Sequence, residues 1–353
     1  MKNFWIKNIV LITVSVISGI TLFLVLKSDI FLNTNALITI LGIIAIATSI
    51  LTLSSVLTKN IDKKDAITYN IAILGLPKSG KTTFITSLFG AVMHGKIKLN
   101  GYNAIVKGNS TIDRINENLS LLDKGIPIGS TTDQTLFAYR VNIEEKSSHI
   151  LRPRKEYQIE IGDFQGEMTQ DLIDLKTNIW KHDSEFFNWV KEANAFVFMV
   201  DLGFYLMDKK TYIAEISKSL RSAWQKIIEL NDNQIDKESR LPIILIFNKA
   251  DVLTAYDVSP SGIKYLAFSE DKLPEMKYST LTDKIKLEVE KDFDDLINFF
   301  TINCKNFSYN FYSSFFTDKY EYQKGLSEIC NHIFPVYVVP KEKKDLLTES
   351  LLG

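Results

Sequence analysis

The chain has 353 residues, with 41 Lys and Arg against 42 Asp and Glu, and its formal net charge is −1. This length exceeds that of one small domain, and the near-neutral charge lacks the basic excess of a nucleic-acid-binding surface, so we expect no nucleic-acid partner. Its two cysteines, Cys304 and Cys330, and its four histidines have no metal-ligand spacing, which argues against a metal site built from them.

The N-terminal part contains two apolar runs without a charged side chain, at residues 9–26 and 36–57. Each is close to the about 20 residues that a helix needs to cross a bilayer core, and a short polar connector joins them. We therefore predict that residues 1–58 form a transmembrane helical hairpin that contacts the lipid bilayer through residues 9–57. A buried core helix and a cleaved signal peptide are the alternative interpretations.

Lysines indicate the orientation of this hairpin. Two precede the first run and three follow the second, at positions 2, 7, 59, 63 and 64, whereas Lys27 alone lies in the connector. Positive charge prefers the cytoplasmic side of a membrane. We predict a multi-pass membrane protein in which both termini and the domain after the hairpin are cytoplasmic.

After a polar linker at residues 59–68, strand and helix patterns alternate through residues 69–335, and residues 336–353 form a tail. Such alternation is typical of an α/β domain with a mostly parallel sheet flanked by helices. Strands are predicted at 69–74, 134–143, 157–161, 195–201, 241–247 and 307–312, the second and third as an antiparallel edge pair. Helices are predicted at 81–89, 111–122, 171–190, 210–230, 281–304 and 324–333. Two insertions, at 91–130 and 252–283, are long enough to be functional.

Residues 75–82 read Gly-Leu-Pro-Lys-Ser-Gly-Lys-Thr and connect the first predicted strand to the first predicted helix. This spacing is that of the phosphate loop of a P-loop NTPase, whose backbone amides surround a triphosphate at a helix N-terminus. Lys81 reaches the outer phosphates and the Thr82 hydroxyl ligates Mg²⁺. Lys78 either adds positive charge or faces solvent. The predicted nucleotide contacts of this loop are Gly75, Pro77, Lys78, Ser79, Gly80, Lys81, Thr82 and Thr83.

A guanine-reading motif, Asn248-Lys249-Ala250-Asp251, directly follows the apolar strand predicted at 241–247. The Asp251 carboxylate can accept hydrogen bonds from N1–H and the 2-amino group of guanine, whereas adenine would leave it buried and unpaired. Asn248 bridges toward the phosphate loop, and the Lys249 stem covers the base plane. After the last strand, Ser313 and Ser314 lie where a backbone amide reaches guanine O6. A polar turn after the strand is the alternative for residues 248–251.

Two weaker motifs lie between these. Asp163-Phe164-Gln165-Gly166 has the form D-x-x-G, in which Asp163 holds Mg²⁺ through a water and the Gly166 amide contacts the γ-phosphate. Upstream, Thr131 or Thr132 supplies a hydroxyl to Mg²⁺, and we favour Thr132. An ordinary Asp-Gly loop and a Ser/Thr-rich turn remain the alternatives.

The ordered set of motifs resembles the Ras-like GTPases of the translation-factor-related class, over roughly residues 68–335. The insertion that ends at residues 125–131, together with a Glu directly after D-x-x-G, is similar to the bacterial double-GTPase group. The resemblance implies a domain that binds GTP and GDP with Mg²⁺ and changes state on hydrolysis. It also implies that the membrane is the bacterial inner membrane.

The catalytic position departs from this family. Ras-like proteins place Gln immediately after D-x-x-G to orient the attacking water, but this chain has Glu167 there, and Gln165 precedes the glycine. A carboxylate can accept a hydrogen bond from water, but its charge opposes the phosphate, so we expect slow hydrolysis. The candidate catalytic residues are Lys81, Thr132, Gln165 and Glu167.

We therefore expect a membrane-anchored GTPase that hydrolyses GTP to GDP and acts as a switch for a cytosolic protein partner. The first alternative is a GTP-binding scaffold or homo-oligomer with negligible hydrolysis, since small residues in the hairpin suit helix association. An ATP-driven transporter or kinase is the second alternative, and Asp251 argues against it.

Overall fold

The computed structural model describes part of the chain. The described residues are 42, 49, 66–124, 126, 128–129, 137–146, 155–163, 185–230, 241–265, 281–314, 319–336 and 338–339. The predicted hairpin, apart from Gly42 and Ser49, most of the linker and nearly all of the tail lie outside these ranges, so their boundaries stay predictions. Within the ranges, no helix has the length and apolar character of a membrane span.

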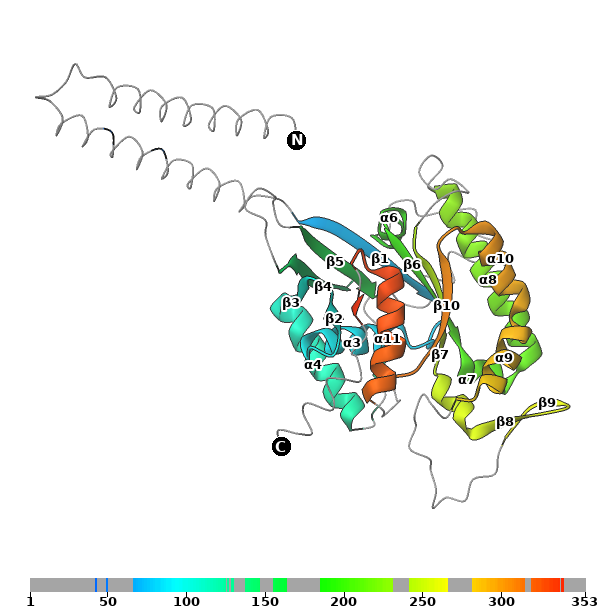
Figure 1. Cartoon of the computed structure of the whole chain (residues 1–353). Helices are drawn as coiled ribbons and strands as arrows, with labels where there is room; N and C mark the ends of the chain where they lie inside the picture. Colours follow the sequence, from blue (N-terminus) through cyan, green and yellow to red (C-terminus); the bar gives the residue numbers. More distant parts are fainter. Residues whose placement is uncertain are drawn as a thin grey trace, which may run out of the picture. The chain divides into compact units, whose positions relative to one another are not determined.

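The chain divides into two compact units, residues 1–65 with 147–155 and residues 66–146 with 156–353. The second unit contains the predicted nucleotide-binding motifs. Nine of its described strands form one sheet (Figure 1). Their order is β10 (Phe307–Tyr312), β7 (Ile243–Asn248), β6 (Ala195–Asp201), β1 (Ile67–Gly75), β5 (Glu156–Asp163), β4 (Phe137–Glu145), β3 (Tyr102–Lys107), β2 (Lys98–Leu99) and β11 (Val338–Val339).

The sheet has a parallel and an antiparallel part. Strands β10, β7, β6, β1 and β5 are parallel to one another, whereas β4, β3, β2 and β11 continue the sheet beyond β5 with antiparallel pairing. Every residue of β6 and β7 is buried, as expected for central parallel strands that are covered on both faces. The predicted α/β fold with a mostly parallel sheet is confirmed for this central part.

Helices cover both faces of the sheet. They are α3 (Lys81–Met93), α4 (Asn109–Asp123), α6 (Glu185–Lys191), α7 (Leu202–Met207), α8 (Lys209–Leu230), α9 (Asp283–Asp292), α10 (Asp294–Asn303) and α11 (Lys319–Ile333). Figure 1 shows α3, α4 and α11 on one side and α8, α9 and α10 on the other. Successive side chains of a strand point to opposite faces, so Phe196 and Phe198 of β6 pack under the second group while Val197 and Met199 pack under the first.

The structure corrects three predictions. The strands predicted at 134–143 and 157–161 do pair antiparallel as β4 and β5, but they are not an edge, because β3 and β2 from the insertion at 91–130 extend the sheet beyond them. The helix predicted at 281–304 is two helices, α9 and α10, which meet at the buried Phe293. The last helix begins at Lys319, five residues before the predicted start.

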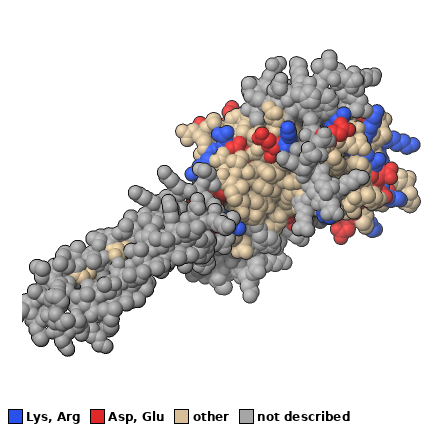
Figure 2. Space-filling model, turned by 90° about the horizontal axis from the view of Figure 1, so that it is seen from above, with Lys and Arg blue, Asp and Glu red and all other residues tan. Residues whose placement is uncertain are grey.

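A 3₁₀ helix, η2 (Ala250–Ala255), runs from the guanine-reading motif into the insertion predicted at 252–283. It is followed by a hairpin of β8 (Tyr256–Ser259) and β9 (Gly262–Tyr265). Of the helix predicted at 171–190, only α6 lies in the described ranges. Acidic and basic side chains are interspersed over the described surface that is visible in Figure 2, which accords with the near-zero net charge.

Candidate functional site

The carboxyl ends of the parallel strands meet at one edge of the sheet. Gly75 ends β1, Asp163 ends β5, Asp201 ends β6 and Asn248 ends β7, while Ser313 directly follows β10. From β1 the chain builds the antiparallel side of the sheet through β5 and then crosses back to β6, so the strand order reverses between β1 and β6. Ligands of open α/β sheets bind in the crevice at such a reversal. The candidate site therefore lies where the phosphate loop leaves β1.

The phosphate loop has the backbone of an anion-binding turn. Lys78 and Gly80 both have positive φ, 63° and 87°, and Gly80 is the residue that precedes the first turn of α3. Because Gly80 has no side chain, it cannot cap the first amides of α3, which leaves them to an anion. A Cβ at Gly80 would lie 2.5 Å from Nδ2 of Asn248, so this position needs glycine for both conformation and space. Pro77 lies at the loop turn and Thr83 in the first turn of α3, both partly exposed.

Lys81 points back over the start of the loop. Its Nζ donates hydrogen bonds to the carbonyl oxygens of Gly75 at 2.9 Å and Leu76 at 3.1 Å, and its side chain is largely buried. Both of these acceptors are neutral carbonyl groups. A phosphate at the start of α3 would offer the ammonium a stronger, charged partner.

Two predicted magnesium ligands are in contact. Oγ1 of Thr82 donates to Oδ1 of Asp163 at 3.1 Å, and Asp163 is 1% exposed. A hydroxyl and a carboxylate are oxygen ligands of the kind that Mg²⁺ prefers, and Mg²⁺ in nucleotide sites is held by few protein ligands besides phosphates. These two side chains fit the ion. Thr131, Thr132, Gln165, Gly166 and Glu167 lie outside the described residues.

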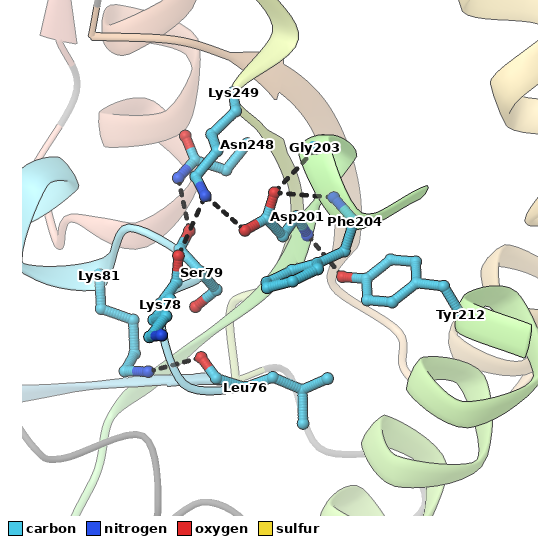
Figure 3. Close-up of polar contacts among 10 residues, drawn as sticks. All are labelled: Leu76, Lys78, Ser79, Lys81, Asp201, Gly203, Phe204, Tyr212, Asn248 and Lys249. Atoms are coloured by element: carbon cyan, nitrogen blue, oxygen red, sulfur yellow. Dashed lines mark hydrogen bonds and ion pairs between the residues drawn. The ribbon is translucent and has the colours of Figure 1, made fainter. Parts of the chain in front are cut away.

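The guanine-reading motif is tied to the phosphate loop by two side chains (Figure 3). Nδ2 of Asn248 donates to the carbonyl oxygen of Ser79 at 2.7 Å. Nζ of Lys249 donates to the carbonyl oxygen of Lys78 at 3.1 Å. The two motifs are about 170 residues apart in sequence, as the separations of 169 and 171 residues show. These two hydrogen bonds join the loop before α3 to the end of β7.

Asp251 lies in η2 and is 9% exposed. Burial raises the pKa of its carboxyl group, and a hydrogen bond from the Ser313 hydroxyl opposes this rise. The carboxylate is thus held by the segment after β10, which was predicted to contribute a backbone amide. Ser314 follows Ser313 and is partly exposed. A buried carboxylate next to a partly open surface suits the recognition of a donor pair such as N1–H and the 2-amino group of guanine.

Sequence reasoning missed Asp201, which ends β6 and is 1% exposed. Its Oδ2 pairs with Nζ of Lys249 at 2.6 Å, and its Oδ1 accepts from the backbone amides of Gly203 and Phe204 at the start of α7. The sequence did contain a signal for this residue. Asp201 ends the strand predicted at 195–201, and an aspartate in such a position is a common helix N-cap. What the sequence did not reveal is that Asp201 lies beside Asn248 in the parallel register.

Comparison with known proteins assigns the family. The family model described as Double-GTPase 2 matches residues 70–309, which include the phosphate loop, Asp163 and the guanine-reading motif. The chain belongs to the Double-GTPase 2 family. It is therefore a P-loop GTPase by family, and guanine nucleotide is the ligand that this membership implies for the site.

Other comparisons add little. A search of curated proteins gave no match. Among solved structures, the chain is similar to nucleolar GTP-binding protein 1 of Plasmodium falciparum, at 14% identity, with 82% of this chain and 93% of that chain covered and a TM-score of 0.32. A likeness this distant says nothing about function.

Proposed function

We propose that this Double-GTPase 2 protein is a membrane-anchored GTPase that binds GTP with Mg²⁺, hydrolyses it to GDP and acts as a switch for a cytosolic partner. The observation that carries the nucleotide part is the pair of hydrogen bonds from Asn248 and Lys249 to the phosphate loop. They hold the base-reading and phosphate-reading segments at a fixed distance, so a ligand with both a guanine and a phosphate chain matches the site.

Different residues would bind the phosphates, the metal ion and the base. The amides at the start of α3 would receive the phosphates, and Lys81 would turn from the Gly75 and Leu76 carbonyls toward the outer ones. Thr82 and Asp163 would hold Mg²⁺, which when bound neutralises charge that develops on the phosphates. Asp251 would read the base.

The catalytic step is a proposal from the sequence. Thr132, Gln165 and Glu167 are the candidates to position the metal and the attacking water, and the carboxylate of Glu167 accounts for our expectation of slow hydrolysis. If the step is negligible, the protein is a GTP-binding scaffold or homo-oligomer instead. The proposed anchor is the apolar hairpin at residues 9–57, in a bacterial inner membrane.

One experiment on the full-length protein tests these parts in turn. Its membrane fraction is washed with alkaline carbonate, which we expect to leave the protein in the membrane. The protein is then purified in detergent, and release of phosphate from GTP is followed in single turnover with and without Mg²⁺. We expect slow release that requires Mg²⁺ and is lost in Lys81→Ala. Release by Glu167→Ala should be slower than release by the wild type.

The matched control is Lys264→Ala, which removes an exposed lysine of β9 and should leave the rate unchanged. Carbonate extraction of the protein would refute the anchor. Bound GTP without Mg²⁺-dependent release would support the scaffold and refute the hydrolytic switch. Stronger thermal protection by ATP than by GTP would refute guanine recognition.

A further inference from the structure

Lys249 connects three elements of the candidate site through one ammonium group. Its Nζ lies 3.1 Å from the carbonyl oxygen of Lys78 in the phosphate loop and 2.6 Å from Oδ2 of Asp201 at the end of β6. Its own backbone stands before η2 with φ of 60°, in the left-handed region. A residue other than glycine keeps a left-handed backbone conformation only where the surrounding structure imposes it.

Asp201 supplies the negative charge of this group. It is 1% exposed, so an unpaired carboxylate there would carry a large desolvation cost. One oxygen accepts the amides of Gly203 and Phe204, and the other accepts the ammonium of Lys249 (Figure 3). Its own amide donates to the hydroxyl of Tyr212 at 2.7 Å. The amides of α7 thus hold one oxygen of the carboxylate, and Tyr212 holds the backbone of the same residue.

The stem of Lys249 passes the backbone at Gly80 and at Gly203, with space for ordinary van der Waals contact on both sides. A Cβ at Gly80 would lie 4.0 Å from Cε of Lys249, and a Cβ at Gly203 would lie 3.8 Å from Cδ. The ring of Phe204 lies with its centroid 5.8 Å from Nζ. With its ammonium held by Asp201 and its carbons between two backbones, the stem has few rotamers left. The side chain is still 36% exposed, so one face of the stem is free to lie against a planar base.

We infer that Asp201 is a positioning residue for guanine-nucleotide retention, which acts by holding Lys249 against the phosphate loop in the orientation that the bound base needs. The inference rests on the proposed nucleotide binding and adds a residue that none of the predicted motifs contains. A lysine that is ordered before the ligand arrives loses less rotamer entropy on binding. Asp201 should therefore act on how long the nucleotide stays, whereas the choice of guanine over adenine should remain with Asp251.

The test is the release of a fluorescent methylanthraniloyl-GDP from the full-length protein, chased by excess GDP. Asp201→Asn keeps an acceptor for the amides of α7 but removes the charge that holds Lys249. We expect release to become about tenfold faster, the factor for losing one charge-assisted hydrogen bond. Lys249→Met, which keeps the apolar stem, should give a similar increase. The double variant should be no faster than either single variant, because both remove one interaction.

The matched control is Glu160→Gln. Glu160 is also a buried carboxylate, 8% exposed and paired with Arg140 at 3.0 Å, but it lies within β5. This variant should release the nucleotide at the wild-type rate. The selectivity for GDP over ADP should be the same in Asp201→Asn as in the wild type.

Different failures have different meanings. If Asp201→Asn lowers the melting temperature but leaves the release rate unchanged, Asp201 only caps α7 and the inference is wrong. Additive effects in the double variant would also overturn it, since Asp201 would then not act through Lys249. If the wild-type protein binds no labelled GDP, the proposed function itself fails, and the inference fails with it.

Discussion

Gly80→Ala is the most direct test of how the two nucleotide-binding segments fit together. Gly80 has φ of 87° and ψ of 24°, where an L-residue costs about 1–2 kcal/mol. The new methyl carbon would also lie 2.5 Å from Nδ2 of Asn248. That amide donates to the carbonyl oxygen of Ser79 at 2.7 Å, so moving it away breaks a buried hydrogen bond worth about 1–3 kcal/mol. The two costs together are about 2–5 kcal/mol.

Gly95→Ala separates these costs. Gly95 also has positive φ, 63°, but no described atom lies within 4 Å of the Cβ that alanine would add. Only the backbone cost of about 1–2 kcal/mol is expected there. The difference between the two variants isolates the collision with Asn248.

The assay is urea unfolding of the full-length protein, with and without GDP, together with equilibrium binding of labelled GDP. We expect Gly80→Ala to lose more unfolding free energy than Gly95→Ala and to lose the stabilisation by GDP, which Gly95→Ala should keep. Equal destabilisation of the two variants, with normal GDP binding in Gly80→Ala, would show that Asn248 and Gly80 are not packed as described.

Two further predictions concern charge and packing. Burial raises the pKa of the Asp251 carboxyl group, and guanine favours its ionised form. GDP binding should therefore release a proton, and the affinity for GDP should fall as the pH drops through the raised pKa. Calorimetry in two buffers of different ionisation enthalpy measures the proton release. Ser313→Ala should move that fall in affinity to higher pH, because the hydroxyl lowers the pKa of Asp251, and an unchanged profile would refute the assignment. In the core, Phe300→Ala should cost about 3–5 kcal/mol of unfolding free energy, because Phe300 is fully buried with its ring centroid 4.9 Å from that of Phe198. Its neighbour Ile302 is 83% exposed, so Ile302→Ala should stay within about 0.5 kcal/mol of the wild type by urea unfolding.

The sequence pattern was sufficient to predict elements whose characteristic residues follow one another along the chain. The strands predicted at 195–201 and 307–312 have the same bounds in the structure, since each is a short apolar or aromatic run with clear ends. The phosphate loop was also recognisable, because its glycine spacing is a requirement of backbone conformation within eight residues. The strand before the loop and the helix after it, β1 and α3, were predicted from their apolar patterns.

The antiparallel extension of the sheet could not be predicted in the same way. β2 has two residues and pairs with β11, whose residues Val338 and Val339 lie far away in the sequence. Two residues carry no periodic signal, and their pairing depends on which sheet edge is left open after β3 and β4 have paired. The break at Phe293 is similar, because the helical pattern continues through it while the buried ring fills a space against Phe247 and Tyr205.

By itself, the sequence determined the ligand class. A phosphate loop, D-x-x-G and N-K-x-D in order predict guanine nucleotide, because each motif is a short stretch whose chemistry depends on local spacing. Only the tertiary structure decided how these motifs are joined. Asp201 and Lys249 meet because β6 and β7 are parallel neighbours with their ends in register, and such neighbourhood is a property of the sheet order, which no local pattern of residues contains.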